Sequence, residues 1–372
     1  MTKLKNISKI SKWFDGLKDP LLIAGPCSAE SEAQMMQTAK EIATLGKVNV
    51  FRSGIWKPRT RPGNFEGVGE EGLQWLQQVK KETGLLTAIE VANAEHVDLA
   101  VKYDIDILWI GARTTSNPFS IQELADHLKG YDKPILVKNP INPDVNLWVG
   151  ALERFHKAGI NKLAAVHRGF YPFEATALRN IPKWEVAIEL KSMCHDLPII
   201  CDPSHISGAT EFIPEISQKA LDLNMDGLMI ETHYNPSVAL SDMNQQLTPA
   251  QLGDLLGNLI YRRTTTKDAD FASMLETLRS QIDSIDQQML ELLAQRMNVV
   301  EEIGKYKSKN EVTILQIRRW EKIIATRLKL GKSMGLSEDF IKKLLQLVHK
   351  ESIQRQTEVM SKLGFSSKKR NN

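Results

Sequence analysis

The sequence predicts an α/β fold in which a closed (β/α)8 barrel, of the TIM-barrel architecture, is followed by an all-α domain of three helices. Eight short apolar runs recur between residues 20 and 234, and amphipathic segments separate them. Beyond Asp268 no strand-like run occurs, and apolar residues return at spacings of three and four. Runs without alternation are typical of strands buried on both faces, and the segments between them suit crossover helices. Because such a barrel takes roughly 250 residues, a chain of 372 residues leaves room for a second domain.

The eight runs are the expected strands. In chain order they are PLLIAG (20–25), VNVFRSG (48–54), LLTAIEV (85–91), DILWIGA (106–112), PILVKN (134–139), KLAAVHRG (162–169), LPIICDPSH (197–205) and GLMIETHY (227–234). Between the second and third runs, EEGLQWLQQVKKETG has the period of an amphipathic helix. We expect the barrel over residues 1–262 and a polar linker over residues 263–270.

The remaining residues, 271–372, are expected to form helices only. The segment from Phe271 to Asn310 has apolar residues at three-and-four spacing and suits one helix of about 40 residues, roughly 60 Å long. A helix of that length needs a partner. Two further helices are expected over 316–331 and 337–362, because Gly331 suits a helix end and Ser337 suits an N-cap.

Composition limits the classes of partner and compartment. The chain has 48 basic and 45 acidic residues, a formal charge of +3, which argues against a nucleic-acid surface. Its three cysteines have no paired spacing, so a reducing compartment and no disulfide framework are expected. The N-terminal stretch MTKLKNISKISKWF lacks an apolar core segment, and no run approaches eighteen apolar residues. We therefore expect a cytoplasmic protein that binds neither nucleic acid nor membrane.

Polar residues follow nearly every predicted strand, at the end of the barrel where active sites of this fold lie. They are Cys27, Lys57-Pro58-Arg59-Thr60, Glu90, Arg113, Lys138, His167-Arg168, Asp202 with His205, and Glu231. A single polar residue here is usually a solvated loop residue, but four basic side chains facing one bowl would repel one another without an anion. Lys57, Arg113, Lys138 and Arg168 therefore predict a substrate with phosphate or carboxylate groups.

Cys27, His205, Glu231 and Asp242 suggest a metal site. In a closed barrel the last strand adjoins the first, so these residues can meet. Mixed sulfur, nitrogen and oxygen ligation suits Mn, Fe, Co or Zn better than Mg or Ca. Spacing alone leaves two alternatives for Cys27, because an isolated cysteine is more often a small buried hydrophobe and can also be a nucleophile.

The motifs AGPCSAES, KPRT, GAR, HRG, DPSH and IETHYNP…ALSD, in this order, resemble the 3-deoxy-D-arabino-heptulosonate-7-phosphate (DAHP) synthases of the short microbial class. The resemblance implies a divalent metal held by Cys27, His205, Glu231 and Asp242. It also implies that phosphoenolpyruvate is held by Arg113, Lys138 and Arg168, and that erythrose 4-phosphate is handled by Lys57, Arg59, Thr60 and Asp202. The implied reaction is an aldol-like condensation in which the metal polarises the aldehyde. Lys138 is either a proton-transfer residue or an anion anchor, and Ser116 departs from an expected glutamine.

The helical part resembles the all-helical chorismate mutases from about Leu275 to Met360. In LRSQIDSIDQQMLELLAQRMNVVEEIGKYK and the segments after it, the matching positions are Arg279, Arg296, Lys307, Arg319, Ser352 and Gln356. Without the resemblance, such residues are expected to be solvated surface residues, and the helical part is expected to be an oligomerisation arm. With it, arginines are expected to clamp the two carboxylates of chorismate while Lys307 and Gln356 donate hydrogen bonds to the ether oxygen. Gln316 and Trp320 stand where aspartate and glutamate are common.

The two resemblances together imply a bifunctional enzyme of aromatic amino-acid synthesis. It would condense phosphoenolpyruvate with erythrose 4-phosphate and rearrange chorismate to prephenate. They also imply a homodimer through the helical domain, in which Arg279 reaches the partner's site. One alternative makes this domain a non-catalytic allosteric sensor of chorismate or prephenate. Another keeps the barrel but uses arabinose 5-phosphate, as octulosonate synthases do, although KPRT favours erythrose 4-phosphate.

Overall fold

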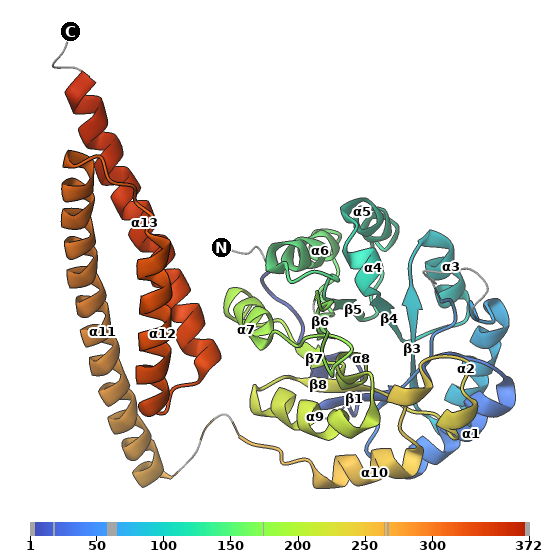
Figure 1. Cartoon of the computed structure of the whole chain (residues 1–372). Coiled ribbons are helices and arrows are strands. Elements are labelled where there is room, and N and C mark those ends of the chain that lie inside the picture. Colours follow the sequence, from blue (N-terminus) through green and yellow to red (C-terminus); the bar gives the residue numbers. More distant parts are fainter. Residues whose placement is uncertain are drawn as a thin grey trace. The chain divides into compact units, whose positions relative to one another are not determined.

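The computed structural model describes residues 4–17, 19–57, 65–173, 175–263, 265 and 268–368, the side chains of 364–368 excepted. The chain divides into two compact units, Met1–Thr264 and Thr265–Asn372 (Figure 1). Each unit is described by itself below.

The first unit is a closed barrel of eight parallel strands, which confirms the predicted fold class (Figure 1). Each strand pairs with the next in sequence, and β8 returns to pair with β1 over five residues, from Leu21 opposite Gly227 to Gly25 opposite Glu231. Every strand lies within one of the eight apolar runs. The strands are β1 (Leu21–Gly25), β2 (Val50–Arg52), β3 (Leu86–Val91), β4 (Ile107–Ile110), β5 (Ile135–Lys138), β6 (Leu163–His167), β7 (Ile199–Cys201) and β8 (Gly227–Glu231).

Helices surround the barrel and begin at residues suited to capping. Ser31, Asn93 and Asp144 accept hydrogen bonds from first-turn backbone N–H groups, and Thr248 forms a reciprocal capping box with Gln251. The helices are α1 (Glu32–Thr44), α2 (Glu70–Thr83), α3 (Ala94–Lys102), α4 (Ala112–Thr115), α5 (Pro118–His127), α6 (Val145–Lys157), α7 (Trp184–Met193), α8 (Pro203–Ser207), α9 (Ile213–Asp222) and α10 (Pro249–Asn258). The short helices α4 and α8 follow β4 and β7 directly, so their residues lie at the C-terminal rim of the barrel.

Strand side chains pack in two layers because successive residues point to opposite faces. One layer fills the space between strands and helices, and the other fills the barrel interior with residues such as Ile23, Val50 and Trp109. Ile10, in the 3-10 helix η1 (Ile10–Lys12), and Trp13 belong to the interior cluster. The N-terminal segment therefore packs against the interior residues, and the polar site described below lies at the C-terminal ends of the strands.

The second unit consists of α11 (Ala269–Lys309), α12 (Ile317–Ser333) and α13 (Glu338–Lys368) (Figure 1). Helix α13 packs against both of the others. Gly331 lies where α12 meets α13, and a Cβ added to it would collide with the side chain of Ile341. The close approach of these two helices therefore depends on glycine.

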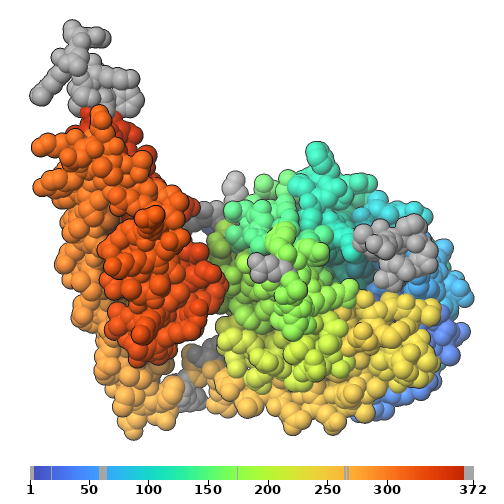
Figure 2. All heavy atoms as spheres, in the orientation of Figure 1, coloured from blue at the N-terminus to red at the C-terminus, as the bar shows by residue number. Residues whose placement is uncertain are grey.

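Helix α11 carries an apolar stripe that the described residues of this unit leave uncovered. Its side chains are between 43% and 64% exposed. They are Phe271, Met274, Leu278, Ile282, Ile285, Met289, Leu292, Val299 and Ile303. In Figure 2 the N-terminal end of α11, in light orange, extends past the darker orange and red atoms of α12 and α13. Within the described part of the chain, no helix is long and apolar enough to cross a membrane.

Candidate active site

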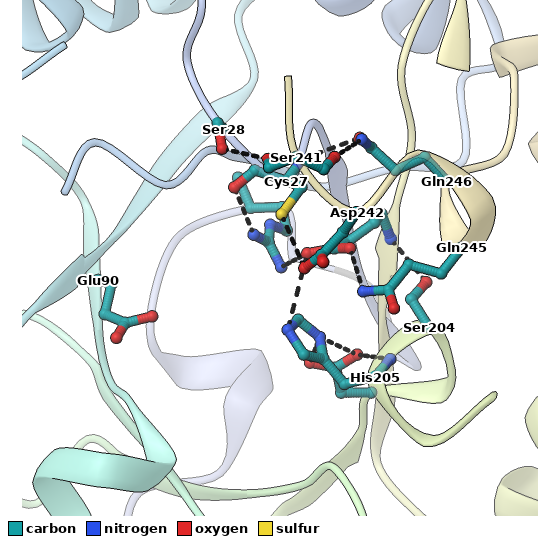
Figure 3. Close-up of polar contacts among 12 residues, drawn as sticks. Cys27, Ser28, Glu90, Ser204, His205, Ser241, Asp242, Gln245 and Gln246 are labelled. Atoms are coloured by element: carbon teal, nitrogen blue, oxygen red, sulfur yellow. Dashed lines mark hydrogen bonds and ion pairs between the residues drawn. The ribbon is translucent and has the colours of Figure 1, made fainter. Parts of the chain in front are cut away.

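Cys27, Glu231 and Asp242 meet where β1 and β8 pair. Figure 3 shows Cys27 beside Asp242. One ligand atom from each lies within 4.8 Å of those of the others. Glu231 ends β8, Cys27 follows β1, and Asp242 lies on the loop after β8, where its Oδ2 is 3.4 Å from the Cys27 Sγ. The pairing of the first and last strands thus brings together residues more than 200 positions apart.

His205 adjoins this cluster and is held by Asp202, the N-cap of α8. The Asp202 carboxylate accepts from the His205 backbone N–H at 3.0 Å, and its Oδ2 is 2.9 Å from Nδ1 of the ring. With the Nδ1 proton donated to Asp202, Nε2 keeps its lone pair and lies 3.8 Å from Glu231 Oε1. Burial lowers the pKa of His205, so the ring is neutral at pH 7, as a metal ligand must be.

The chemistry of this donor set fits a divalent transition metal. Glu231 Oε1 is buried and lies 3.3 Å from Arg52 Nη1 but accepts no hydrogen bond, although buried carboxylate oxygens normally accept one. A thiol, an imidazole and two carboxylates are the combination that Mn, Fe, Co or Zn prefers. Burial, and then the nearby Glu231 carboxylate, raise the pKa of the Cys27 thiol to about 11. Cys27 therefore keeps its proton unless a cation replaces it.

Basic side chains from several strands line the same rim. Lys57 Nζ donates to Cys27 Sγ at 3.0 Å, and Lys138 Nζ forms a buried pair with Asp202 at 2.9 Å. Arg168 donates to Asn180 at 3.0 Å. Burial lowers the pKa of Arg168 to about 10; the Asp202 carboxylate opposes this shift, and the positive charges of Arg179 and Arg113 add to it. This crowding of cations favours a bound anion. Arg59 and Thr60 lie outside the described residues.

Four residues that the motifs did not single out also belong to this site: Arg52, Trp109, Arg179 and Gln245. Arg52 Nη1 lies 3.3 Å from Glu231 Oε1, and its guanidinium stacks 4.8 Å from the centroid of the Trp109 ring. Trp109 donates to Glu90 at 2.9 Å, and Lys138 Nζ lies 5.7 Å from its ring centroid. Arg52 could have been found from the sequence, because an arginine within an apolar run must face a charge. Trp109 resembles any other core residue in sequence.

Ser116, the unexpected residue after GAR, links two rim loops. Its Oγ donates to Ala112 O at 2.9 Å and accepts from the Ile141 backbone N–H at 3.2 Å. Since Ala112 begins α4 and Ile141 follows β5, the hydroxyl ties the loop of Arg113 to the loop after Lys138.

A second polar cluster lies between α11 and α13. Arg296 Nη1 donates to Ser352 Oγ at 2.6 Å, and Gln356 Nε2 donates to Ser352 O at 3.2 Å. Only 8% of Gln356 is exposed, yet its Oε1 has no hydrogen-bond partner. Lys307 Nζ donates to Ile314 O at 2.5 Å. An arginine beside an unpaired buried amide oxygen is a polar site that a bound ligand can complete.

The structure also places the other residues singled out in this unit, which do not bond to that cluster. Arg279 precedes Arg296 by seventeen residues on α11, or about 25 Å at the rise of an α-helix. Arg319 is exposed on α12. Trp320 stacks on His349 with ring centroids 3.9 Å apart, and Gln316 is the N-cap of α12 without a capping side-chain bond.

Comparison with known families assigns both units. The sequence profile of the DAHP synthetase I family matches residues 4–265, and that of chorismate mutase type II matches residues 278–357. A phospho-2-dehydro-3-deoxyheptonate aldolase of Thermotoga maritima is 33% identical over 226 residues, which are 61% of this chain. The match spans 64% of that relative's length. A 2-dehydro-3-deoxyphosphooctonate aldolase of Acidithiobacillus ferrooxidans is 28% identical over 69% of this chain and 94% of its own.

Solved structures agree on the barrel. The crystal structure of the Thermotoga maritima aldolase, a DAHP synthase, superposes with a TM-score of 0.58 at 31% identity, covering 64% of this chain and 67% of that one. A truncated form of the synthase from the same organism gives 0.55 at 28% identity, over 64% of this chain and 84% of that one. Both resemblances read from the motifs are thus confirmed: the chain belongs to the DAHP synthetase I family and carries a chorismate mutase type II domain after its barrel.

Proposed function

We propose that this chain is a bifunctional enzyme of aromatic amino-acid synthesis. Its barrel domain, residues 1–262, would condense phosphoenolpyruvate with erythrose 4-phosphate to DAHP and phosphate. Its helical domain, residues 271–372, would rearrange chorismate to prephenate, with residues 263–270 as the linker. The observation that carries the first activity is the cluster of Cys27, Glu231 and Asp242 beside the basic rim. We assign both activities to the cytoplasm, with no nucleic-acid or membrane partner.

In the barrel, the basic rim residues hold the two anionic substrates. Arg113, Lys138 and Arg168 bind phosphoenolpyruvate, and Lys57, Arg59, Thr60 and Asp202 handle erythrose 4-phosphate. Cys27, His205, Glu231 and Asp242 would hold a divalent Mn, Fe, Co or Zn ion, and such an ion would supply Lewis-acid polarisation of the aldehyde. Orientation of the two anions lets carbon 3 of phosphoenolpyruvate attack the aldehyde carbon, after which water adds at carbon 2 and phosphate leaves.

Lys138 and Lys57 are positioned for more than charge. Lys138 Nζ forms an ion pair with the buried Asp202 carboxylate at 2.9 Å. A lysine that is paired with a carboxylate inside the site can donate a proton to the substrate and then be protonated again. Lys57 Nζ contacts the Cys27 sulfur at 3.0 Å, so the substrate-binding and metal-binding parts of the site adjoin.

In the helical domain, rearrangement needs only a clamp and hydrogen-bond donors. Arg296, together with Arg319 and the partner's Arg279, would bind the two carboxylates and hold the reactive conformer. Ser352 orients Arg296 through their 2.6 Å hydrogen bond. Lys307 and Gln356 would donate to the ether oxygen as negative charge develops there.

We infer a homodimer through the helical domain. The exposed stripe of α11 continues from Phe271 to Ile303, too much apolar surface to leave in water on a 41-residue helix. Pairing two such stripes would cover them and bring Arg279 of one chain toward the site of the other. Light scattering of the purified protein tests this, and a monomer would contradict it.

The two activities are tested on one preparation of the full chain, with and without a chelator. We expect condensation to need metal and chorismate turnover to survive chelation, because the rearrangement uses none. The variant Cys27→Ala should lose condensation while keeping chorismate turnover and dimerisation. Full condensation by that variant would remove Cys27 from the ligand set.

Two other functions have support and are separated by the same assays. The octulosonate relative at 28% identity favours arabinose 5-phosphate as the sugar, and phosphoenolpyruvate consumption with each sugar decides between them. The Trp320–His349 stack favours a non-catalytic sensor of chorismate or prephenate in the helical domain. Tight chorismate binding without turnover, with altered barrel kinetics, would establish that allosteric role.

A further inference from the structure

The two carboxylates of the metal cluster each have one oxygen already occupied. Gln245 Nε2 donates to Glu231 Oε2 at 2.6 Å, and Arg179 Nη1 pairs with Asp242 Oδ1 at 3.1 Å. The other oxygens face the common centre: Glu231 Oε1 lies 3.8 Å from His205 Nε2, and Asp242 Oδ2 lies 3.4 Å from the Cys27 sulfur. Gln245 and Arg179 therefore bond the oxygens turned away from the centre, while Glu231 Oε1, which faces the centre, pairs with Arg52 Nη1 at 3.3 Å without a hydrogen bond.

The two occupying groups are themselves linked and fixed. Arg179 Nη1 also donates to Gln245 Oε1 at 2.6 Å, so one network spans both carboxylates. Gln245 is 1% exposed, and the Arg179 backbone N–H is held by Ser207 O at 3.0 Å. A buried amide with both ends bonded cannot turn without breaking a hydrogen bond.

The next residue, Gln246, holds the loops that carry the ligands. Its Oε1 accepts from the Cys27 backbone N–H at 2.9 Å, and its Nε2 donates to Ser241 O at 2.8 Å (Figure 3). Ser241 precedes Asp242 and also hydrogen-bonds Ser28, which follows Cys27. Consecutive glutamines thus hold Glu231 by its side chain and the two flanking loops by their backbones.

We propose that Gln245 and Arg179 are positioning residues that limit Glu231 and Asp242 to one metal-facing oxygen each. This inference rests on the proposed metal site. Calcium takes six to eight oxygens and often binds carboxylates through both. Two one-oxygen carboxylates, a thiolate and an imidazole make a site of low coordination number, which suits small transition metals. The network therefore sets metal selectivity as well as affinity.

Cobalt(II) titration of chelator-treated full-length protein tests the proposal without an activity assay. The thiolate-to-cobalt charge-transfer band reports that Cys27 is bound, and the visible d–d bands weaken as coordination number rises. The test variants are Gln245→Met, which frees Glu231 Oε2, and Arg179→Met, which frees Asp242 Oδ1. The matched control is Gln34→Met, because Gln34 is a buried amide on the same rim that bonds Ser28 O and the Glu30 N–H but no ligand side chain.

We expect each test variant to bind cobalt about 10- to 100-fold more weakly, with weaker d–d bands, while Gln34→Met keeps the wild-type spectrum. Calcium should compete with cobalt more effectively in Gln245→Met than in wild type. Circular dichroism confirms folding, and Arg179, which is partly exposed, gives a second variant if Gln245→Met does not fold. Wild-type affinity and spectrum in folded Gln245→Met and Arg179→Met would overturn the inference. If cobalt(II) gave no charge-transfer band with the wild-type protein, that result would instead contradict the proposed metal site itself.

Discussion

Metal binding by this protein should release one proton, and that proton should come from Cys27. Burial raises the pKa of the thiol to about 11, so at pH 7 it is protonated in the metal-free protein. Cysteine binds metal as the thiolate. The pKa of the thiol lies about four units above a working pH of 7, so removing its proton costs about 5 kcal/mol. The sulfur–metal bond must offset this cost.

The other proposed ligands should contribute no protons. Burial lowers the pKa of His205, so the ring is already neutral at pH 7. Burial alone would raise the pKa of Asp242, but Arg179, His205 and Lys57 hold it well below its usual range. The pKa of Glu231 is also lowered, by His205 and Arg52 against the effect of burial. Both carboxylates are therefore ionised before metal arrives.

The expected pH dependence has a definite sign and size. Because the thiol pKa lies above the assay range, apparent metal affinity should rise about tenfold per pH unit between pH 6.5 and 8.5. Calorimetric titration with cobalt(II), in buffers of different protonation enthalpy, counts the protons released. Cys27→Ala should bind more weakly and release none. A flat pH dependence, or proton release that persists in Cys27→Ala, would refute the reasoning.

Three further perturbations test other parts of the structure. Lys138→Met should lower the free energy of unfolding by about 3–5 kcal/mol, because it leaves the Asp202 carboxylate buried without its lysine; urea denaturation measures this. Arg296→Ala should slow chorismate rearrangement at least about 100-fold and leave condensation unchanged, as followed by ultraviolet absorbance. Gly331→Ala should destabilise the helical unit by about 1–3 kcal/mol, because its methyl group meets Ile341; far-ultraviolet circular dichroism on heating measures this.

Each of these has a control within the chain. Adding Asp202→Asn to Lys138→Met should recover part of the lost stability, since the uncompensated charge is gone. Gly257→Ala, on α10 with open space around the new methyl, should be neutral or slightly stabilising. A Gly331→Ala protein as stable as Gly257→Ala would contradict the proposed close contact. Equal loss of both activities in Arg296→Ala would indicate misfolding rather than a local role.

The barrel was predictable because its strands are buried on both faces. That burial requires unbroken apolar runs, and each of the eight runs contains one strand. The long helix was predictable from three-and-four spacing, and it extends from Ala269 to Lys309. The third helix of the second unit continues to Lys368, beyond the expected residue 362 and through Gly364.

The sequence predicted only those site residues that lie at the ends of strands, because the order of the strands determines which of them are neighbours. Glu231 ends β8 opposite Gly25, and Cys27 follows β1 two residues later, so barrel closure places them together. Arg179 lies in the long segment between β6 and α7, and Gln245 ends the short 3-10 helix η4 (Met243–Gln245) in the segment after β8. Their mutual contact depends on the conformations of these two segments, which the hydrophobic periodicity of the sequence does not predict. Trp109 has the apolar character of a core residue, and only the structure shows that Arg52 and Lys138 both lie close to its ring.

The pairing of β1 with β8 also fixes when a metal site can exist during synthesis. Asp242 leaves the ribosome 215 residues after Cys27, and Glu231 leaves it only slightly earlier. A nascent chain stopped before β8 contains at most two of the four proposed ligands, Cys27 and His205, and lacks both carboxylates. The complete set of four proposed ligands is therefore present only once β8 and the loop after it have been made, which precedes synthesis of the helical domain in the chain order.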